Sequence, residues 1–215
     1  MEAAAPSLPR LNEPAPDFEK APSTQGPISL KDYRGKWVVL FSHPADFTPV
    51  CTTELSEFAR RAPEFEKLGV QLMGLSIDSI YSHIAWVRSM EQHFGVKVKY
   101  PLIADLSMDV AHKYGMIHPG ASSTATVRCV FVIDDEGILK AMIYYPLTNG
   151  RSVDEVFRIV QSLQTSKKQG VATPEGWKPG DKVIVPAPMT VGDAEKRVGD
   201  KTLDVTDWYF SKKQL

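Results

Sequence analysis

The stretch Trp37-Val-Val-Leu-Phe-Ser-His-Pro-Ala-Asp-Phe-Thr-Pro-Val-Cys-Thr-Thr-Glu54 decides how this chain folds. Its first five residues form an apolar run that predicts a buried strand. Beyond it, apolar residues between Leu55 and Phe65 fall on one side of a predicted helix. Cys51 is therefore expected where a strand passes through a proline-containing loop into the first turn of a helix. The free backbone N–H groups and the positive end of the helix dipole favour a thiolate there, so Cys51 is a candidate nucleophile.

The neighbours of Cys51 favour a reactive thiol over a small core residue, which is what most free cysteines are. Pro44 and Pro49 fix φ on both sides of the loop, so its shape is rigid before a ligand arrives. Thr48 lies three residues before the sulfur and carries a hydroxyl that can donate or accept a hydrogen bond. His43 adds a titratable group at the end of the strand. A cysteine that only fills a gap needs none of these groups.

From Trp37 onward, short apolar runs alternate with stretches of helical periodicity. This alternation predicts an α/β layer fold of thioredoxin type. Strands are expected at 37–41, 70–77, 102–104, 127–133 and 139–145, and further helices at 81–94, 107–114 and 153–164. The turn composition of residues 134–137 predicts a hairpin between the last two strands.

The character of the sequence changes after Lys168, where proline, glycine and polar residues dominate. We expect a domain at 1–168 and an extended C-terminal arm at 169–215 that builds no core of its own. Trp177, Val183–Val185 and Trp208–Phe210 would then offer apolar surface to a dimer partner. The alternative is that they pack back onto their own domain.

The composition indicates an ordinary globular protein. The chain has 215 residues, a formal net charge of −1, 43% apolar residues and 24% charged residues. Near-neutral charge gives no case for nucleic acid or anionic membrane as a partner, and no apolar run reaches transmembrane length. Met1–Pro6 lacks the features of a secretory signal, and two cysteines do not suggest a disulfide framework. A cytoplasmic, reducing environment is expected.

Pro44-x-x-x-Thr48-x-x-Cys51 resembles the peroxidatic signature of the peroxiredoxins, and its surroundings are similar to the one-cysteine branch of that family. Further matching stretches are Gly74–Ser79, Pro101–Asp105, Thr126–Arg128, Tyr145–Arg151 and Val171–Trp177. The resemblance implies a thioredoxin-like fold with a C-terminal extension. It also implies a thiol-specific peroxidase that reduces hydrogen peroxide and alkyl hydroperoxides without metal, flavin or haem.

Two arginines are candidates for the peroxide site. Strand alternation puts Val127 and Cys129 on the core face and Arg128 on the opposite face. Arg128 could be a solvated edge charge, but the resemblance assigns it to the thiolate and the bound peroxide, and its rigid fork of donors suits that task. Arg151 matches a second family arginine that supports the same pocket. It could also be an ordinary surface residue at a helix N-terminus.

Glu54 and His43 are supporting candidates. Glu54 falls in the first helical turn, where a carboxylate suits the dipole, and the resemblance implies that it organises the arginines. A plain capping role is the alternative. The resemblance places His43 close to the sulfur. The remaining histidines have no metal-ligand spacing and are expected on the surface or on helix faces: His83, His93, His112 and His118.

Cys129 decides the subtype of the predicted peroxidase. It could form a disulfide with oxidised Cys51, but strand alternation turns it toward the core, and no cysteine follows it. An external thiol, either a small thiol or a thioredoxin-like protein, is therefore expected to reduce the sulfenic acid. The resemblance implies a homodimer and leaves a ring of dimers open.

Two other function classes are weighed against the peroxidase. Holdase activity is compatible with an apolar arm, which by itself does not distinguish a dimer clasp from a client surface. Lipid hydrolysis, claimed for some relatives, is disfavoured because Lys36 stands where those relatives carry a serine. In addition, Gly74–Asp78 lacks the final glycine of a nucleophile elbow.

Overall fold

The computed structural model describes residues 8–215. Met1–Pro6, on which the expectation about a secretory signal rests, lies outside the described residues. The chain divides into two compact units, Met1–Val153 and Asp154–Leu215. Across residues 8–215, no helix is both long and apolar enough to cross a bilayer.

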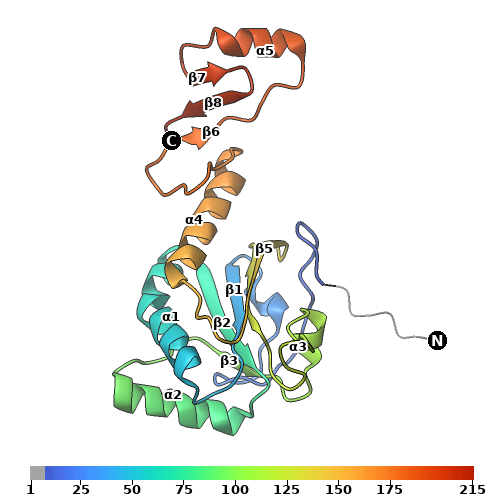
Figure 1. Cartoon of the computed structure of the whole chain (residues 1–215), viewed down its shortest axis with the longest axis vertical. Coiled ribbons are helices and arrows are strands. Elements are labelled where there is room, and N and C mark those ends of the chain that lie inside the picture. The colour runs from blue at the N-terminus through green and yellow to red at the C-terminus, as the bar shows by residue number, and fades with distance from the viewer. Residues whose placement is uncertain (1–7) are drawn as a thin grey trace, which may run out of the picture. The chain divides into compact units, whose positions relative to one another are not determined.

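The first unit is built on a five-stranded sheet in the order β3-β2-β1-β4-β5 (Figure 1). Its strands are β1 (Trp37–Ser42), β2 (Val70–Ser76), β3 (Leu102–Ala104), β4 (Arg128–Ile133) and β5 (Leu139–Tyr145). β1 pairs with β2 in parallel and with β4 antiparallel. All six residues of β1 are buried, as expected for a central strand covered on both faces. This is the α/β layer that the sequence predicts.

Helices cover both faces of this sheet. They are α1 (Pro49–Lys67), α2 (Ile80–Phe94) and α3 (Asp109–Lys113), with a 3-10 turn at Leu30–Tyr33. Figure 1 shows α1 and α2 on one side of the sheet and α3 on the other. On the α1 side, the ring of Phe41 stacks on Phe58 with centroids 4.1 Å apart. On the other side, Cys129 and Phe131 of β4 join a core cluster with residues of α3.

The alternation of side chains along β4 therefore decides which residue of this strand reaches the site. Cys129 faces the α3 side, so its neighbour Arg128 projects toward α1, which carries Cys51. The side chains of both faces are buried, because helices cover each of them.

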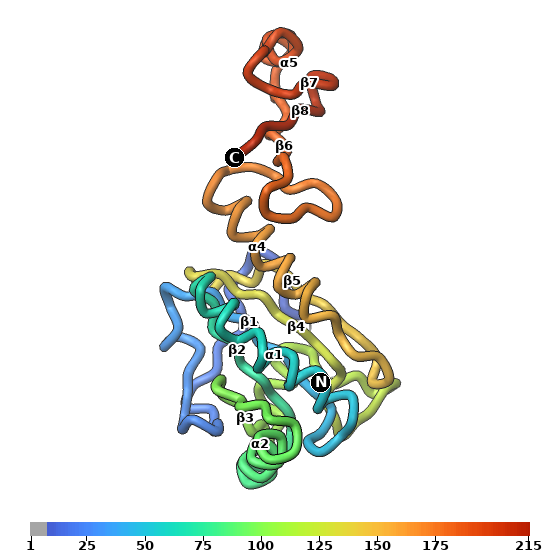
Figure 2. The backbone as a smooth tube through the Cα atoms, turned by 90° about the vertical axis from the view of Figure 1, so that its left-hand side faces the viewer, coloured from blue at the N-terminus to red at the C-terminus, as the bar shows by residue number. Residues whose placement is uncertain are grey.

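The second unit contains α4 (Val153–Gln169) from its second residue onward. It continues through β6 (Val183–Ile184), α5 (Val191–Val198), β7 (Asp204–Asp207) and β8 (Phe210–Lys213). The three strands form an antiparallel sheet in the order β6-β8-β7. Figure 2 shows α5, β7 and β8 grouped together in this unit.

The C-terminal segment does build a small core, so the prediction of a coreless arm is wrong. Trp177 and Val183 are buried with Val171 in one cluster. A backbone bridge between Ala172 and Ile184 folds the segment back on itself and brings these side chains together. The predicted exposure is correct for other residues of the set: Trp208 is 43% exposed and Tyr209 is 56% exposed.

Candidate active site around Cys51

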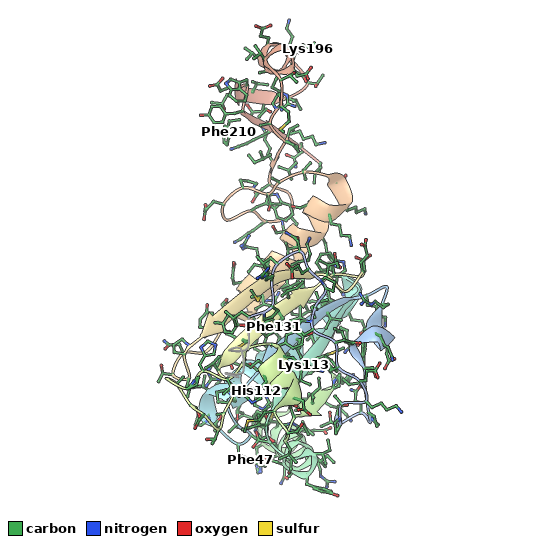
Figure 3. The ribbon with its side chains drawn as sticks, turned by 90° about the vertical axis from the view of Figure 1, so that its right-hand side faces the viewer. Phe47, His112, Lys113, Phe131, Lys196 and Phe210 are labelled. Carbon is green, nitrogen blue, oxygen red and sulfur yellow. The ribbon has the colours of Figure 1, made fainter. Side chains whose placement is uncertain are left out.

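Cys51 lies in the first turn of α1, directly after the loop that leaves β1. Thr48 is the N-cap of the helix, and Pro49 is its first residue, a position that tolerates proline because that N–H has no helical partner. Phe47 has a φ of 55°, a left-handed conformation that costs about 1–2 kcal/mol and turns the chain into the helix. Figure 3 shows Phe47 beside α2. The sulfur of Cys51 is buried at a helix N-terminus, where the sequence places it.

Arg128 contacts the sulfur directly. Its Nη1 donates to Cys51 Sγ at 3.3 Å and to Glu54 Oε2 at 2.7 Å. Its Nε and Nη2 donate to the carbonyl oxygen of Leu147 at 3.0 and 2.8 Å. The guanidinium is thus held on three sides and keeps a positive charge against the sulfur. A cation in this position favours the thiolate over the thiol.

Glu54 joins the two arginines. Its Oε1 accepts hydrogen bonds from the backbone N and Nε of Arg151 at 2.6 and 2.9 Å, and its Oε2 accepts from Arg151 Nη2 at 2.8 Å. Arg151 Nη1 donates to the carbonyl of Cys129 at 2.6 Å. Burial opposes ionisation of Glu54 most strongly, but the hydrogen bonds and charges of Arg151 and Arg128 outweigh it and lower the pKa of the carboxyl.

The charges of the buried groups at this site cancel only when Cys51 is a thiolate. Arg128, Arg151 and Glu54 are each at least 93% buried, and together they carry two positive charges and one negative charge. An uncompensated buried charge is costly, and a thiolate at Cys51 removes the excess. The site is therefore arranged for an anionic sulfur.

Thr48 and Pro44 shape the loop in front of the sulfur, and both are half-buried. The hydroxyl of Thr48 donates to the carbonyl of Ala45 at 2.8 Å and does not cap the helix through its side chain. Because its one proton is used there, the Thr48 oxygen is left as an acceptor for a ligand that carries a proton.

Comparison with known proteins identifies the family of this chain. Residues 11–142 match the model of the AhpC/TSA family, and residues 162–201 match the C-terminal domain of 1-Cys peroxiredoxin. A peroxiredoxin of Aquifex aeolicus is 56% identical over 220 aligned residues, which cover 97% of this chain and 98% of that protein. The chain belongs to the peroxiredoxin family. It is a thiol-dependent peroxidase whose oxidised cysteine is reduced by an external thiol.

Solved peroxiredoxin structures have the same fold. The yeast mitochondrial 1-Cys peroxiredoxin superposes with a TM-score of 0.85 at 40% identity, covering 97% of this chain and all of that one. Peroxiredoxin 6 of Arenicola marina gives a TM-score of 0.83 at 37% identity and covers 95% of this chain. The predicted thioredoxin-like fold and the assignment to the one-cysteine branch are confirmed.

In this peroxiredoxin, Cys51, Glu54, Arg128 and Arg151 come together in one hydrogen-bonded group. The alternative placements of the arginines and Glu54 as solvated or capping residues do not hold, because all three are buried and bonded. The expectation for Cys129 as a core residue also agrees with its position. Burial raises the pKa of its thiol to about 12, although a hydrogen bond with Ser42 and the charge of Arg151 act to lower it. Cys129 is therefore a protonated thiol at neutral pH.

His43 is buried, and its ring nitrogen Nε2 forms a hydrogen bond of 2.8 Å with Asp46 Oδ1. Of the two expected positions for His83, the surface and a helix face, the structure shows the second, on the buried face of α2. His83 is fully buried, and its Nδ1 lies 2.7 Å from Asp46 Oδ2. The sequence carried a signal for this burial, since Trp86 and Met90 continue the same buried face of α2 at helical spacing. Asp46 gave no such signal apart from its place in the loop.

The residue types of this cluster are those of a metal site. His43, Asp46 and His83 offer ligand atoms that all lie within 4.8 Å of one another. However, the contacts to Asp46 are 2.7 and 2.8 Å, whereas ligands bonded to a tetrahedral zinc ion at about 2.0–2.2 Å stand roughly 3.3 Å or more apart. These distances describe hydrogen bonds, so the three groups share protons.

Proposed function

We propose that Cys51 is the peroxidatic nucleophile and that Arg128 holds both its thiolate and the bound hydroperoxide. The observation that carries this proposal is the 3.3 Å contact between Arg128 Nη1 and Cys51 Sγ inside a buried group with one excess positive charge. Glu54 and Arg151 fix the orientation of Arg128 and are supporting residues. His43 supports the site from the start of the loop.

The chemistry follows from these positions. The thiolate attacks the terminal oxygen of the hydroperoxide, the O–O bond breaks, and the leaving oxygen takes the electron pair. Arg128 stabilises the negative charge that moves from sulfur to oxygen, as preorganised donors do at an oxyanion. Thr48 orients the peroxide by accepting a hydrogen bond from its O–H group, and Pro44 keeps the loop in the shape that this requires. Cys51 becomes a sulfenic acid.

We infer that hydrogen peroxide and alkyl hydroperoxides are the substrates and that a small thiol or a thioredoxin-like protein is the reductant. The yeast mitochondrial relative resolves its thiol through glutathione and thioredoxin systems, which supports both kinds of reductant. The buried position and raised pKa of Cys129 argue against an internal disulfide, because the thiolate is the attacking species in disulfide formation.

We also propose a homodimer formed through the C-terminal segment 169–215, with residues 1–168 as the peroxidase domain. Exposed apolar residues of that segment support an interface: Met189 is 97% exposed, Val191 is 76% exposed, and Trp208 and Tyr209 are half-exposed. Assembly of dimers into a ring is a further step of the same proposal. A cytoplasmic location is proposed from the two free cysteines, which suit a reducing compartment.

The nucleophile is tested with Cys51→Ser and, as a matched control, Cys129→Ala. Peroxide consumption with a thiol reductant should be lost in the first variant and kept in the second. Full turnover by Cys51→Ser would contradict the proposal. Mass spectrometry of the peroxide-treated wild type should show a sulfenic acid on Cys51. Sedimentation of Trp208→Ala against wild type tests the dimer, which this substitution should weaken.

A further inference from the structure

The edge of β2 that faces β3 is only partly paired. β2 pairs with β1 from Val70 to Leu75, but it pairs with β3 only from Gly74 to Ser76. Within residues 8–215, no strand covers this edge over residues 70–72. β2 also contains no charged residue and no proline, so the strand itself carries none of the groups that usually protect a free edge.

The hydrogen bonds of β2 show which of its backbone groups point to this edge. The N–H of Gly74 donates to the carbonyl of Pro101, just before β3. On the opposite edge, the carbonyl of Leu75 accepts from the N–H of His43, just after β1. Successive residues of a strand direct their N–H and C=O groups to opposite neighbours, so Leu72 faces the same edge as Gly74.

Pro101 explains why the pairing with β3 stops. Gly74 pairs with Leu102, so in a continued parallel register the carbonyl of Leu72 would accept from the N–H of residue 101. Proline has no N–H, and this bond cannot form. The Leu72 carbonyl accepts instead from the side-chain amide of its neighbour Gln71, at 2.8 Å. A side chain thus occupies an acceptor that a strand would otherwise use.

The N–H of Leu72 lacks its strand partner as well. In the same register it would donate to the carbonyl of Lys99, but that carbonyl accepts from the side-chain amide of Gln25. The described part of the chain, residues 8–215, offers no other acceptor to this N–H. Leu72 therefore presents a free donor, next to an acceptor held only by the Gln71 side chain.

A cleft of about 380 Å³ lies along this edge, and residues 69–72 line it. Ala59, Ala62 and Pro63 of α1 give it an apolar wall. Pro63 lies inside the helix and has no N–H, so the carbonyl of Ala59, four residues earlier, lacks its regular helical donor. The cleft thus combines an apolar wall with unpaired backbone groups of a strand edge. An extended peptide that adds a strand to a sheet uses both features.

The rim of the cleft is positively charged. Lys36, Lys97 and Lys99 line it against a single acidic residue, Glu66, which leaves an excess of two positive charges. Lys97 also pairs with Glu91 at 3.5 Å, but both side chains are more than half exposed, and such pairs are weak. Charge complementarity therefore favours an acidic ligand.

We propose that this cleft binds an extended acidic peptide segment of a partner protein, which adds a short strand to the free edge of β2. A carbonyl of the peptide accepts from the Leu72 N–H, and an N–H of the peptide donates to the Leu72 carbonyl in place of Gln71. Acidic side chains of the peptide lie against Lys36 and Lys99. Lys36 precedes β1 whereas Cys51 follows it, so the peptide binds at the opposite end of the sheet from the peroxide site.

Three labelled peptides separate strand pairing from attraction by charge. The probe is an octapeptide of alternating valine and glutamate, and binding is followed by fluorescence anisotropy. A second peptide has lysine in place of each glutamate and should bind at least about tenfold more weakly. A third keeps the valine–glutamate sequence but is N-methylated at every residue, which removes its N–H groups. It should also bind about tenfold more weakly or worse, because the hydrogen bonds to β2 are lost.

Substitutions and hydrogen exchange locate the binding site. The double variant Lys36→Gln/Lys99→Gln should bind the valine–glutamate peptide about three- to tenfold more weakly, the range for two exposed ion pairs. Lys168→Gln/Lys201→Gln, at exposed positions of the second unit, is the matched control and should bind like wild type. In NMR hydrogen exchange, a saturating amount of peptide should slow the Leu72 amide at least about tenfold. The Met73 amide, which faces β1, should not change.

Equal binding of the N-methylated peptide would overturn the proposal, because charge alone would then explain the affinity. So would wild-type affinity in Lys36→Gln/Lys99→Gln, or a Leu72 amide whose exchange the peptide does not slow. Protection of Leu72 that rises with protein concentration in the absence of peptide would also overturn it, since a second copy of the chain would then cover the edge. None of these measurements uses peroxidase turnover, so a failure of the role proposed for Cys51 is a separate result.

Discussion

Replacing Arg128 by lysine tests whether the fork of the guanidinium, and not only its charge, activates Cys51. Arg128 donates to the sulfur, to Glu54 and twice to the Leu147 carbonyl. A lysine ammonium is a single centre and cannot reproduce these directions. A hydrogen bond to a charged group contributes about 1.5–3 kcal/mol, and each 1.36 kcal/mol changes a rate tenfold, so the loss should be roughly 10- to 160-fold.

The rate constant for oxidation of Cys51 by hydrogen peroxide, followed by stopped-flow fluorescence, measures this effect. Arg60→Lys is the control, since Arg60 lies on α1 in an exposed pair with Glu57. Urea unfolding should be measured in parallel, because the Leu147 carbonyl loses two donors in Arg128→Lys. Oxidation within about twofold of wild type, by a folded Arg128→Lys protein, would refute the reasoning that bond geometry at the sulfur sets the rate.

Three further predictions concern other parts of the site. Glu54→Gln leaves four arginine donors without a carboxylate and should cost about 3–5 kcal/mol in urea unfolding at pH 7. Folding lowers the pKa of Glu54, so the stability that its carboxylate contributes is complete above about pH 4.5 and is lost as the pH falls through the folded-state pKa. The unfolding free energies of wild type and Glu54→Gln should therefore converge in acid. A difference between them that stays constant with pH would contradict this prediction. Thr48→Val should oxidise about two- to twelvefold more slowly in stopped flow, the range for one neutral hydrogen bond, while Thr48→Ser stays near wild type. Cys129→Ala should keep turnover, and a Cys51–Cys129 disulfide in peroxide-treated wild type, seen by mass spectrometry, would count against a purely structural Cys129.

Local patterns in the sequence determine much of this protein. The apolar run at 37–41 and the helical periodicity after Leu55 place Cys51 at a helix N-terminus, because these patterns depend only on neighbouring residues. Strand alternation assigns Arg128 and Cys129 to opposite faces for the same reason. The fold class and the candidate nucleophile are thus readable without a structure.

Contacts between distant segments had to be seen in three dimensions. Glu54 meets Arg128 and Arg151 across 74 and 97 residues of chain, and Asp46 meets His83 across 37. Periodicity shows which face of an element is buried but not which buried polar group will face another. For the same reason the core around Trp177 was missed, since it depends on the chain folding back through the bridge between Ala172 and Ile184. The sequence alone determined where the sulfur lies, and the tertiary structure decided which charges and protons surround it.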